Sequence, residues 1–397
     1  MCLKKFNMQK KIAVIAYTTF STDSRVQKEA QAAFDAGYSV DVYTLNETNL
    51  KNFDHFNFYF SQSGQYKGRG KVKYTSAYLK FFLFTLFLVT KNSSAKRYKI
   101  IHVHNMPNFL VFTALIPKLF GAKIILDIHD LVPEIYSVKF GLQLTHPIIK
   151  LLYLEERLSA RFANEIISTN KFHTERFKKN RITNKNFTEI INVASSKTFN
   201  YVSNKNYNSN VLNIIYPSTL SLRLGVGILI DAISFLKQKN IPVKLKIFGD
   251  GEDRDKIIQM IKGKNLDNEI FISNGFISLK ELSLEMDNAH LGVIPLPFNV
   301  SNDIAMPVKS YEYFSKKICV VASDLTLLKN YFPNEMLFFK QNNAEDLSKK
   351  LELLYYDRKR LREYALRGYE TFRRKEWKYY ANKYINLLNF LSSKQKN

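Results

Sequence analysis

The chain has 397 residues, 46% of them hydrophobic, and this length suggests two domains with ordinary packed cores. Only 14 glycines and 10 prolines occur, which excludes long low-complexity regions, and two cysteines are too few for a disulfide framework and fit a reducing compartment. The net charge of +24 attracts anions in general, so it does not choose between nucleic acid, anionic lipid and phosphorylated substrates.

The first half alternates strand-like and helix-like segments. Basic residues followed by the apolar run 12–17 resemble a signal peptide, but no small-residue cleavage site follows, so we expect a first β-strand there. Strands are predicted at 11–17, 40–45, 100–104, 123–127, 165–169 and 189–193, and helices at 25–36, 107–119 and 148–162. Apolar runs alternating with helices favour a parallel sheet covered on both faces.

The same alternation restarts after a polar, Asn- and Ser-rich linker at 201–210. Strands are predicted at 212–216, 244–248, 269–273, 291–295, 319–322 and 336–339, and helices at 227–238, 253–261, 279–286, 308–314 and 344–355. The basic tail 358–391 is predicted to be helical and to cross back onto the first domain. The sequence thus predicts two α/β units in tandem, with ligands at the carboxyl ends of their strands.

The most apolar segment is 79–89, far shorter than the ~20 residues that span a bilayer. Basic residues flank it on both sides, at Lys67, Arg69, Lys71, Lys73, Lys91, Lys96, Arg97 and Lys99. A helix that is apolar nearly all round is either buried or embedded in a membrane interface. Both interpretations, a core helix and a membrane contact, stay open at this point.

A Gly-x-Gly turn follows the strand predicted at 244–248. Gly249 and Gly251 permit close approach of the backbone to a phosphate or base, and the helix start that follows favours negative charge. A plain tight turn and a metal-binding cluster formed by the acidic residues of this turn remain alternatives.

Two further segments carry basic side chains at predicted strand-to-helix turns. Lys309 and Glu312 are three residues apart, so they share one helix face and suit a diphosphate and ribose hydroxyls respectively. Arg223 precedes Gly225 in a loop, and arginine pairs with diphosphate oxygens. The alternatives are an exposed Lys–Glu pair and a solvated arginine.

His129 follows the strand predicted at 123–127, where side chains enter a ligand site. Histidine can hydrogen-bond a sugar hydroxyl or a leaving phosphate, and it titrates near neutral pH. Asp127, His129 and Asp130 also suggest metal ligands, with His102 and His104 as the further residues that could come near.

These patterns follow one another along nearly the whole chain. In order they are Asp23-Ser-Arg25-Val26, Ile101-His-Val-His-Asn105, Asp127-Ile-His129-Asp130 with Pro133-Glu134, Arg223-Leu-Gly225, Gly249-Asp-Gly251, Gly275, and Pro307-Val-Lys309-Ser-Tyr-Glu312-Tyr313. Together they resemble the family-4 retaining glycosyltransferases, which have the two-domain GT-B fold. The resemblance implies an α/β protein with two Rossmann-like domains facing across a cleft. Residues 1–205 would bind the acceptor, 206–375 the nucleotide-sugar, and 376–397 would form a helix on the first domain.

The resemblance also implies roles for individual residues. His129 would lie near the donor sugar, Arg223 and Lys309 would bind the diphosphate, and these three form the expected catalytic set. The expected donor-binding residues are Gly249, Gly251, Gly275, Asp303 and Glu312, with Glu312 on the ribose. The expected acceptor-side residues are Asp23, Arg25, His104, Asp130 and Glu134. Neither a metal ion nor any other cofactor is expected.

Three positions depart from the family pattern. The first glutamate of the family's E-x7-E motif is Ile304 here, with Asp303 adjacent but out of register by one residue. Leu224 replaces a common lysine, and Pro217-Ser218 replaces a glycine. The missing glutamate usually faces the transferred sugar, so its absence leaves the identity of the donor sugar open. It also leaves open the alternative that the protein is a non-catalytic, degenerate member that binds only sugar or a partner enzyme.

The resemblance implies a retaining, metal-independent hexosyltransferase, with a nucleotide-sugar donor and a glycan or lipid-linked acceptor. We expect it in the cytoplasm, peripheral on the inner face of the cell membrane, in cell-surface polysaccharide synthesis. A nucleic-acid binder is disfavoured because the aromatic residues fall mainly in apolar runs and no nucleic-acid module is recognised. A dinucleotide-dependent oxidoreductase is disfavoured because the first turn lacks G-x-G-x-x-G.

Overall fold

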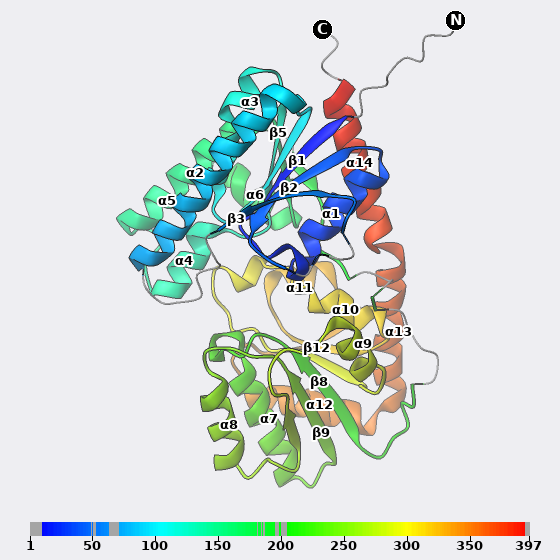
Figure 1. Ribbon diagram of the computed structural model, residues 1–397. Helices are drawn as coiled ribbons and strands as arrows, with labels where there is room; N and C mark the ends of the chain where they lie inside the picture. The colour runs from blue at the N-terminus through cyan, green and yellow to red at the C-terminus, as the bar shows by residue number, and fades with distance from the viewer. Residues whose placement is uncertain are drawn as a thin grey trace, which may run out of the picture. The chain divides into compact units, whose positions relative to one another are not determined.

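The computed structural model describes residues 10–393 except 49, 51–52, 63–70, 181, 184, 186, 195–197 and 200–204 (Figure 1). The chain divides into two compact units. Unit 1 contains Met1–Ile191 and Tyr380–Asn397, and unit 2 contains Asn192–Tyr379. Part of the predicted linker and of the basic flanks, including Lys67 and Arg69, lies outside the described residues.

Unit 1 is built on a seven-stranded parallel sheet with the order β3-β2-β1-β4-β5-β6-β7. Its apolar β-branched strands are nearly all buried, which is typical of a parallel sheet covered by helices on both faces. The chain order reverses between the neighbours β1 and β4, which makes this the switch point where open α/β sheets bind ligands. The strands are β1 Lys11–Ile15, β2 Ser39–Leu45, β3 Asn57–Ser61, β4 Ile100–His104, β5 Lys123–Ile128, β6 Glu165–Ser168 and β7 Phe187–Glu189.

The helices of unit 1 cover both faces of this sheet. Helices α2, α3 and α5 lie together on one side, and α1 lies on the other side with the C-terminal helix α14 (Figure 1). The elements are η1 Phe20–Thr22, α1 Ser24–Asp35, α2 Lys71–Lys96, η2 Asn108–Ala114, α3 Leu115–Leu119, α4 Val132–Phe140, α5 Pro147–Phe162 and α6 Lys171–Lys179.

The C-terminal helix, α14 Trp377–Ser393, packs on unit 1, as the sequence predicted. The Tyr384 hydroxyl lies 2.8 Å from Nδ1 of His102 on β4. The Tyr38 hydroxyl donates to the Leu388 carbonyl at 3.1 Å. The last helix is therefore part of the first sheet's covering layer although it is distant in sequence.

Unit 2 is built on a six-stranded parallel sheet with the order β10-β9-β8-β11-β12-β13, and its switch point lies between β8 and β11. The strands are β8 Leu212–Pro217, β9 Val243–Phe248, β10 Ile270–Ile272, β11 Leu291–Ile294, β12 Cys319–Ser323 and β13 Met336–Phe339. The remaining elements are η3 Leu222–Leu224, α7 Val226–Gln238, α8 Arg254–Gly263, α9 Leu279–Asp287, η4 Asn302–Ile304, α10 Lys309–Ser315, α11 Thr326–Tyr331, α12 Ala344–Tyr356 and α13 Arg358–Arg374.

Three details of the sequence reading were wrong. Strand β3 was not predicted, because its aromatic run stands among Asn, Asp and His residues that suggest a loop. The single helix predicted at 107–119 consists of the 3-10 helix η2 followed by α3, and β7 ends at Glu189, where the predicted strand begins. Across the part of the chain that the structure describes, no helix is both long and apolar enough to cross a membrane.

Candidate functional site

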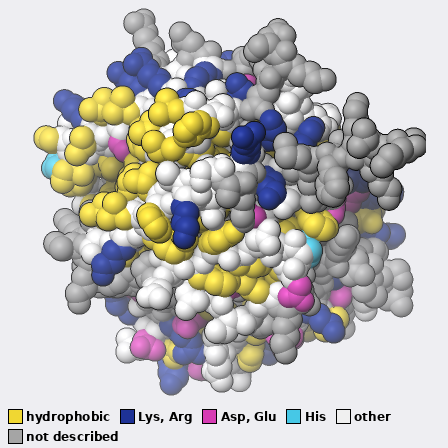
Figure 2. Space-filling model, turned by 45° about the horizontal axis from the view of Figure 1, so that its top comes forward, with side chains coloured by type: hydrophobic (Ala, Val, Ile, Leu, Met, Phe, Trp, Pro, Cys, Tyr) yellow, Lys and Arg dark blue, Asp and Glu magenta, His cyan; other side chains and the backbone are white. Residues whose placement is uncertain are grey.

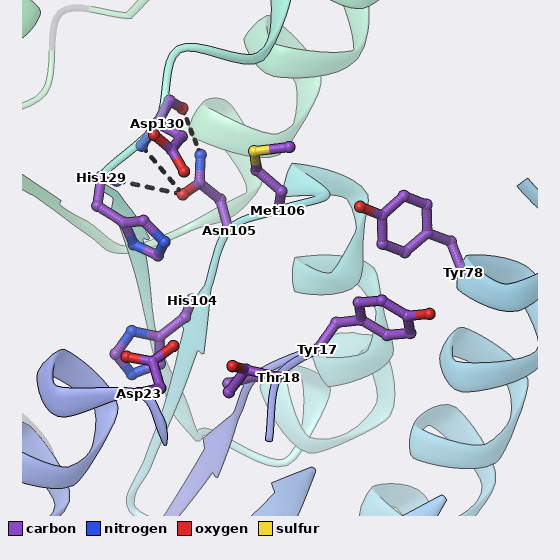
Figure 3. Close-up of a pocket in the computed structure, with 10 residues that line it drawn as sticks. Tyr17, Thr18, Asp23, Tyr78, His104, Asn105, Met106, His129 and Asp130 are labelled. Carbon is purple, nitrogen blue, oxygen red and sulfur yellow. Dashed lines mark hydrogen bonds between the residues drawn. The ribbon is translucent and has the colours of Figure 1, made fainter. Parts of the chain in front are cut away.

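A pocket of about 260 Å³ opens at the switch point of unit 1 (Figure 3). It lies where β1, β4 and β5 end, and Tyr78 of α2 closes one side. The lining residues are Ala16, Tyr17, Thr18, Asp23, Tyr78, His104, Asn105, Met106, His129 and Asp130. Carboxylate, imidazole, amide and hydroxyl groups together with aromatic rings suit a polar ligand with several hydroxyl groups.

The Asn105 side chain holds the loop that carries His129 and Asp130. Its Oδ1 accepts hydrogen bonds from the backbone N–H groups of His129 (3.2 Å) and Asp130 (3.3 Å). Its Nδ2 donates to the Asp130 carbonyl at 2.6 Å and to Asn108 at 3.1 Å. One buried amide therefore fixes the end of β4 to the end of β5 and sets the directions of both pocket side chains (Figure 3).

The His129 imidazole is about one quarter exposed and lies with Nδ1 3.7 Å from Oδ2 of Asp127. Burial lowers the pKa of His129, but the Asp127 carboxylate reverses this effect, so the pKa rises above its usual value. The imidazole accordingly reaches the pocket, and the buried Asp127 carboxylate favours its protonated form.

A buried charge cluster lies beneath the pocket. The Arg25 guanidinium donates from Nε (2.6 Å) and Nη2 (2.7 Å) to the two oxygens of Asp127, and from Nη1 to the Ile190 carbonyl. Burial disfavours the charge of Asp127, yet Arg25 holds the pKa of this carboxyl well below its usual range. Burial raises the pKa of Glu29 to about 7, although Arg25 at 3.3 Å opposes the rise.

This cluster contains the one group of described side chains that could hold a metal ion. Glu29, His102, His104 and Asp127 each offer one atom, and these atoms lie within 4.8 Å of one another. Arg25, however, occupies both oxygens of Asp127, and its positive charge repels a second cation. We therefore interpret the group as a buried ion-pair cluster that joins α1 to the ends of β4 and β5.

The structure separates the predicted acceptor-side residues into two sets. Asp23, His104 and Asp130 line the pocket, and Asp23 also caps α1 by accepting from the N–H groups of Arg25 and Val26. Arg25 is only 3% exposed and lies in the cluster below. This buried position does not support a direct contact between Arg25 and an acceptor.

Glu134 also lies away from the pocket lining. The Arg176 guanidinium donates to both of its oxygens, at 2.9 and 2.8 Å, and the Tyr153 hydroxyl donates at 2.9 Å. Arg176 binds Glu156 as well. Glu134 is thus a buried member of an ion-pair network that joins α4, α5 and α6.

In unit 2, Lys309 lies against the end of β8 and the residue that follows it. Lys309 donates from Nζ to the Ser218 hydroxyl at 3.2 Å and lies 4.6 Å from the centre of the Tyr216 ring. Burial lowers the pKa of Lys309 to about 8, while nearby Glu312 opposes the decrease. The amine therefore stands directly beyond β8, on the same helix as Glu312.

Gly249 and Gly251 bring the loop after β8 against the turn after β9. A Cβ atom on Gly249, whose φ is +151°, would lie 1.9 Å from the Ser218 carbonyl oxygen. A Cβ on Gly251 would lie 2.4 Å from the Leu220 carbonyl oxygen. Because neither glycine has a side chain, the backbone of the loop after β8 packs directly against them, and this contact positions Ser218 beside Lys309.

The other predicted donor residues have distinct surroundings. Arg223 in η3 is exposed and has neither a hydrogen bond nor an ion pair with the residues that the structure describes. Gly275 has φ +115° and an open side with no atom within 4 Å of a Cβ position. The Asp303 carboxylate accepts from the N–H of Thr326 at 2.8 Å and so caps α11, which leaves one oxygen for a ligand.

The sequence reading missed the supporting residues of both sites. Asn105 follows the His-x-His strand directly, and its place at a strand end was the signal available. Tyr17 and Tyr78 gave no signal, because aromatic residues are common in loops and helices, and Ser218 was noted only as a departure from the family pattern.

Comparison with known proteins supports the class suggested by the fold. Residues 200–371 match the family model "Glycosyl transferases group 1", and they lie within unit 2. Chitobiosyldiphosphodolichol beta-mannosyltransferase of Candida albicans is 22% identical over 276 residues. That match covers 64% of this chain and spans 59% of the Candida protein.

Several solved structures share the architecture. Sucrose-phosphate synthase from Thermosynechococcus elongatus matches with a TM-score of 0.77 and 16% identity, over 98% of this chain and all of that one. A glycosyltransferase from Rickettsia africae matches with a TM-score of 0.71, 14% identity and the same coverage. Anabaena HepE, solved in complex with UDP-glucose, matches with a TM-score of 0.70 and 14% identity, over 96% of this chain and 99% of that one.

The molecule therefore has the GT-B fold, an α/β architecture built from two parallel sheets. More particularly, residues 200–371 of unit 2 are the part of the chain that matches the group 1 glycosyl transferase model. The predicted resemblance is confirmed at this level, and the family-4 assignment remains a finer prediction.

Proposed function

We propose that the protein transfers a sugar from a nucleotide-sugar donor to a hydroxyl group of a glycan or lipid-linked acceptor. The observation that carries this proposal is the placement of Lys309 beside Ser218 at the switch point of unit 2, with Glu312 on the same short helix. A half-buried amine suits a diphosphate, and a carboxylate nearby suits ribose hydroxyls. Unit 2 is the proposed donor-binding unit.

The donor class is supported by what related proteins bind. The structure of Anabaena HepE was determined with UDP-glucose, and the Candida relative is named a mannosyltransferase. The exposed Arg223 adds a second positive charge to unit 2 on the loop after β8. We propose that Arg223 and Lys309 together bind the donor diphosphate.

The proposed mechanism stabilises the negative charge that develops on the departing diphosphate. Cationic side chains aimed at that charge lower the barrier without reorganisation during the reaction, and Arg223 and Lys309 can supply this charge without a metal ion. We propose transfer with retention, in which the acceptor hydroxyl attacks on the face from which the diphosphate leaves. The departing phosphate oxygen then takes the hydroxyl proton.

Unit 1 is the proposed acceptor-binding unit. His129, Asp130 and Asp23 point hydrogen-bonding groups at one pocket, with Tyr17 and Tyr78 beside them (Figure 3). Hydroxyl-rich ligands are bound by such groups, and aromatic rings pack on their apolar faces. We propose that the acceptor belongs to a cell-surface polysaccharide pathway and that the protein works at the inner face of the cell membrane.

A transfer assay tests the proposed function. The purified protein is incubated with UDP-, GDP- and ADP-sugars, and release of the nucleoside diphosphate is followed with water or a lipid-linked glycan as acceptor. One nucleotide series should be hydrolysed slowly and consumed faster with acceptor, and NMR of the product should show the donor's anomeric configuration. Absence of turnover with every donor would contradict an active transferase.

A second function is favoured by one observation. Ile304 replaces the first motif glutamate, and the neighbouring Asp303 is engaged in capping α11. A protein that binds a nucleotide-sugar without transferring the sugar is consistent with this loss. Nucleotide binding without hydrolysis in the same assay would identify that function.

A further inference from the structure

Three helices of unit 1 expose large apolar side chains to solvent. On α2 these are Leu79, Leu83 and Phe87, which are spaced by four residues and therefore share one face. On α5 they are Ile148, Leu151, Leu154 and Leu158, and the α3 region adds Leu115, Leu119 and Phe120. Their exposed fractions run from 48% at Leu115 to 84% at Phe120.

These side chains form one surface, which we call the docking face. The 3-10 helix η2 contacts α2, α3 and α5. The Phe82 ring of α2 lies 5.7 Å from Phe109 of η2, and Phe112 of η2 lies 5.2 Å from Phe162 at the end of α5. Figure 2 shows the apolar side chains gathered on one part of the surface, with Lys and Arg side chains among and around them.

The inner side of α2 is already fully packed. Tyr78, Phe81 and Val89 are buried, and the Tyr17 ring lies 4.6 Å from Tyr78 and 5.2 Å from Phe81. The exposed leucines and Phe87 are therefore surplus to the core of unit 1. An apolar surface of this extent on a folded unit is typical of a contact site.

The charges on the docking face are mainly positive. Helices α2 and α3 contain no acidic residue, and α5 contains only Glu155 and Glu156. Glu155 accepts hydrogen bonds from Asn108 and Ser159, and Glu156 is buried against Arg176. Exposed basic residues on these helices include Lys80, Lys91, Lys150 and Arg161.

We propose that the docking face binds the surface of an anionic lipid bilayer. Apolar side chains enter the boundary between headgroups and acyl chains, and surrounding lysines and arginines bind anionic headgroups. A second copy of this chain is a poorer occupant, because two such faces repel each other by like charge. The proposal rests on the proposed function, since it places the acceptor-binding unit at the membrane.

The position of the docking face explains how it would serve the pocket of unit 1. Tyr78 lines that pocket, and the next residue, Leu79, begins the exposed row on α2. Helix α2 therefore contributes both to the pocket and to the surface that would contact lipid. An acceptor whose lipid tail stays in the bilayer could reach the pocket with its polar head.

Vesicle flotation tests the docking face. The full-length protein is mixed with phosphatidylcholine vesicles that contain about one-third phosphatidylglycerol, and with pure phosphatidylcholine vesicles, at low and high salt. The variants are Leu151→Glu on α5 and Phe87→Glu on α2. The matched control is Leu284→Glu on α9 of unit 2, where the leucine is 60% exposed, close to the 64% of Leu151.

We expect the wild-type protein and Leu284→Glu to float with anionic vesicles, and binding to weaken with salt and on pure phosphatidylcholine. Leu151→Glu and Phe87→Glu should each weaken binding at least about tenfold. Failure of the wild-type protein to bind at low salt, or equal losses in all three variants, overturns the proposal. So does a wild-type dimer on size-exclusion chromatography with light scattering that Leu151→Glu dissociates.

The same samples separate this proposal from the proposed function. Binding of UDP, GDP and ADP is measured by calorimetry for the wild-type protein and the three variants. Unchanged nucleotide binding in Leu151→Glu and Phe87→Glu is expected and shows that unit 2 is intact, and an unchanged thermal unfolding transition shows that unit 1 is folded. Vesicle binding by a protein that binds none of the three nucleotides would contradict the transferase and leave the docking face supported.

Discussion

Lys309 is the residue whose surroundings bear most directly on donor binding. Its amine lies between the Tyr216 ring and the Ser218 hydroxyl, and burial lowers its pKa to about 8 from a usual value of 10.5. The amine is therefore charged below about pH 8 and loses its proton as the pH rises through that value. Loss of this proton should weaken the binding of a diphosphate ligand, because the negatively charged diphosphate is attracted by the charged amine.

We predict that affinity for the nucleoside diphosphate falls as the pH rises from about 7 to about 9.5. Bound diphosphate favours the charged amine, so the midpoint in the complex lies at or above about pH 8. Calorimetric titrations across this range measure the effect. The Lys309→Arg side chain stays charged throughout this range, so the affinity of that variant should not depend on pH. An equal pH dependence in the variant would show that another group causes the effect.

Asn105 gives a second prediction at this scale. Asn105→Ala removes the acceptor for two backbone N–H groups and the donor to the Asp130 carbonyl, all in a buried place. We expect unfolding to become easier by about 1–3 kcal/mol in urea denaturation, with weakened acceptor use. The exposed Asn288, at the end of α9, provides the control, since Asn288→Ala should change stability by less than about 0.5 kcal/mol.

Single residues were predicted unevenly from the sequence. The position of His129 just beyond β5 could be predicted, because parallel strands deliver the residues that follow them to one edge of the sheet. Lys309 could be predicted at a helix start, where it begins α10. Arg25 could not be distinguished from a ligand-binding arginine. Its partner Asp127 is about a hundred residues away, and only the pairing of β1 with β4 and of β4 with β5 brings the two together.

At the scale of elements, the turn after β9 is held by contact between backbones. Gly249→Ala would place a Cβ 1.9 Å from the Ser218 carbonyl oxygen at a φ of +151°, which side chains rarely adopt. We expect a loss of at least about 2 kcal/mol in unfolding free energy and weaker nucleotide binding, because Ser218 moves away from Lys309. Gly263→Ala at the end of α8 is the control, since no atom lies within 4 Å of its Cβ position; equal effects of both changes would contradict the assignment.

The attachment of α14 gives a prediction for a whole helix. Tyr384→Phe removes the hydroxyl that lies 2.8 Å from Nδ1 of His102. One such hydrogen bond contributes about 0.5–1.5 kcal/mol, so the thermal midpoint should fall by a few degrees. Tyr356→Phe, at a tyrosine that is mostly exposed, should leave the midpoint unchanged. A larger loss for Tyr356→Phe than for Tyr384→Phe would contradict this role of the hydroxyl.

Most elements of both sheets could be predicted because continuous apolar runs alternate with amphipathic stretches. Strand β3 could not, since its short aromatic run is flanked by polar residues that suggest a loop, and it pairs only with β2 at the sheet edge. Helix α2 was left open between core and membrane, and the structure shows why. One side of the helix packs on unit 1, and the opposite side is equally apolar and exposed. Hydrophobic content alone does not distinguish these two sides.

For the molecule as a whole, the shared fold extends over more of the chain than the family match does. The GT-B architecture extends over nearly all of it, whereas the group 1 match is limited to residues 200–371 in unit 2. Unit 1 carries the polar pocket and the docking face, and the sequence indicated only parts of each: four of the pocket residues and the apolar segment 79–89. The fold of unit 2 was therefore more accessible to prediction than the pocket and docking face of unit 1, where distant segments assemble the surface.

The central claim is that unit 2 binds a nucleoside diphosphate through Lys309 and Glu312. Isothermal calorimetry with UDP, GDP and ADP on the wild-type protein, Glu312→Ala and the exposed control Glu345→Ala tests it most directly. We predict binding of one of the three nucleotides, weakened at least about tenfold by Glu312→Ala and unchanged by Glu345→Ala. No binding of any nucleotide by the wild-type protein, or unchanged affinity in Glu312→Ala, would contradict the account.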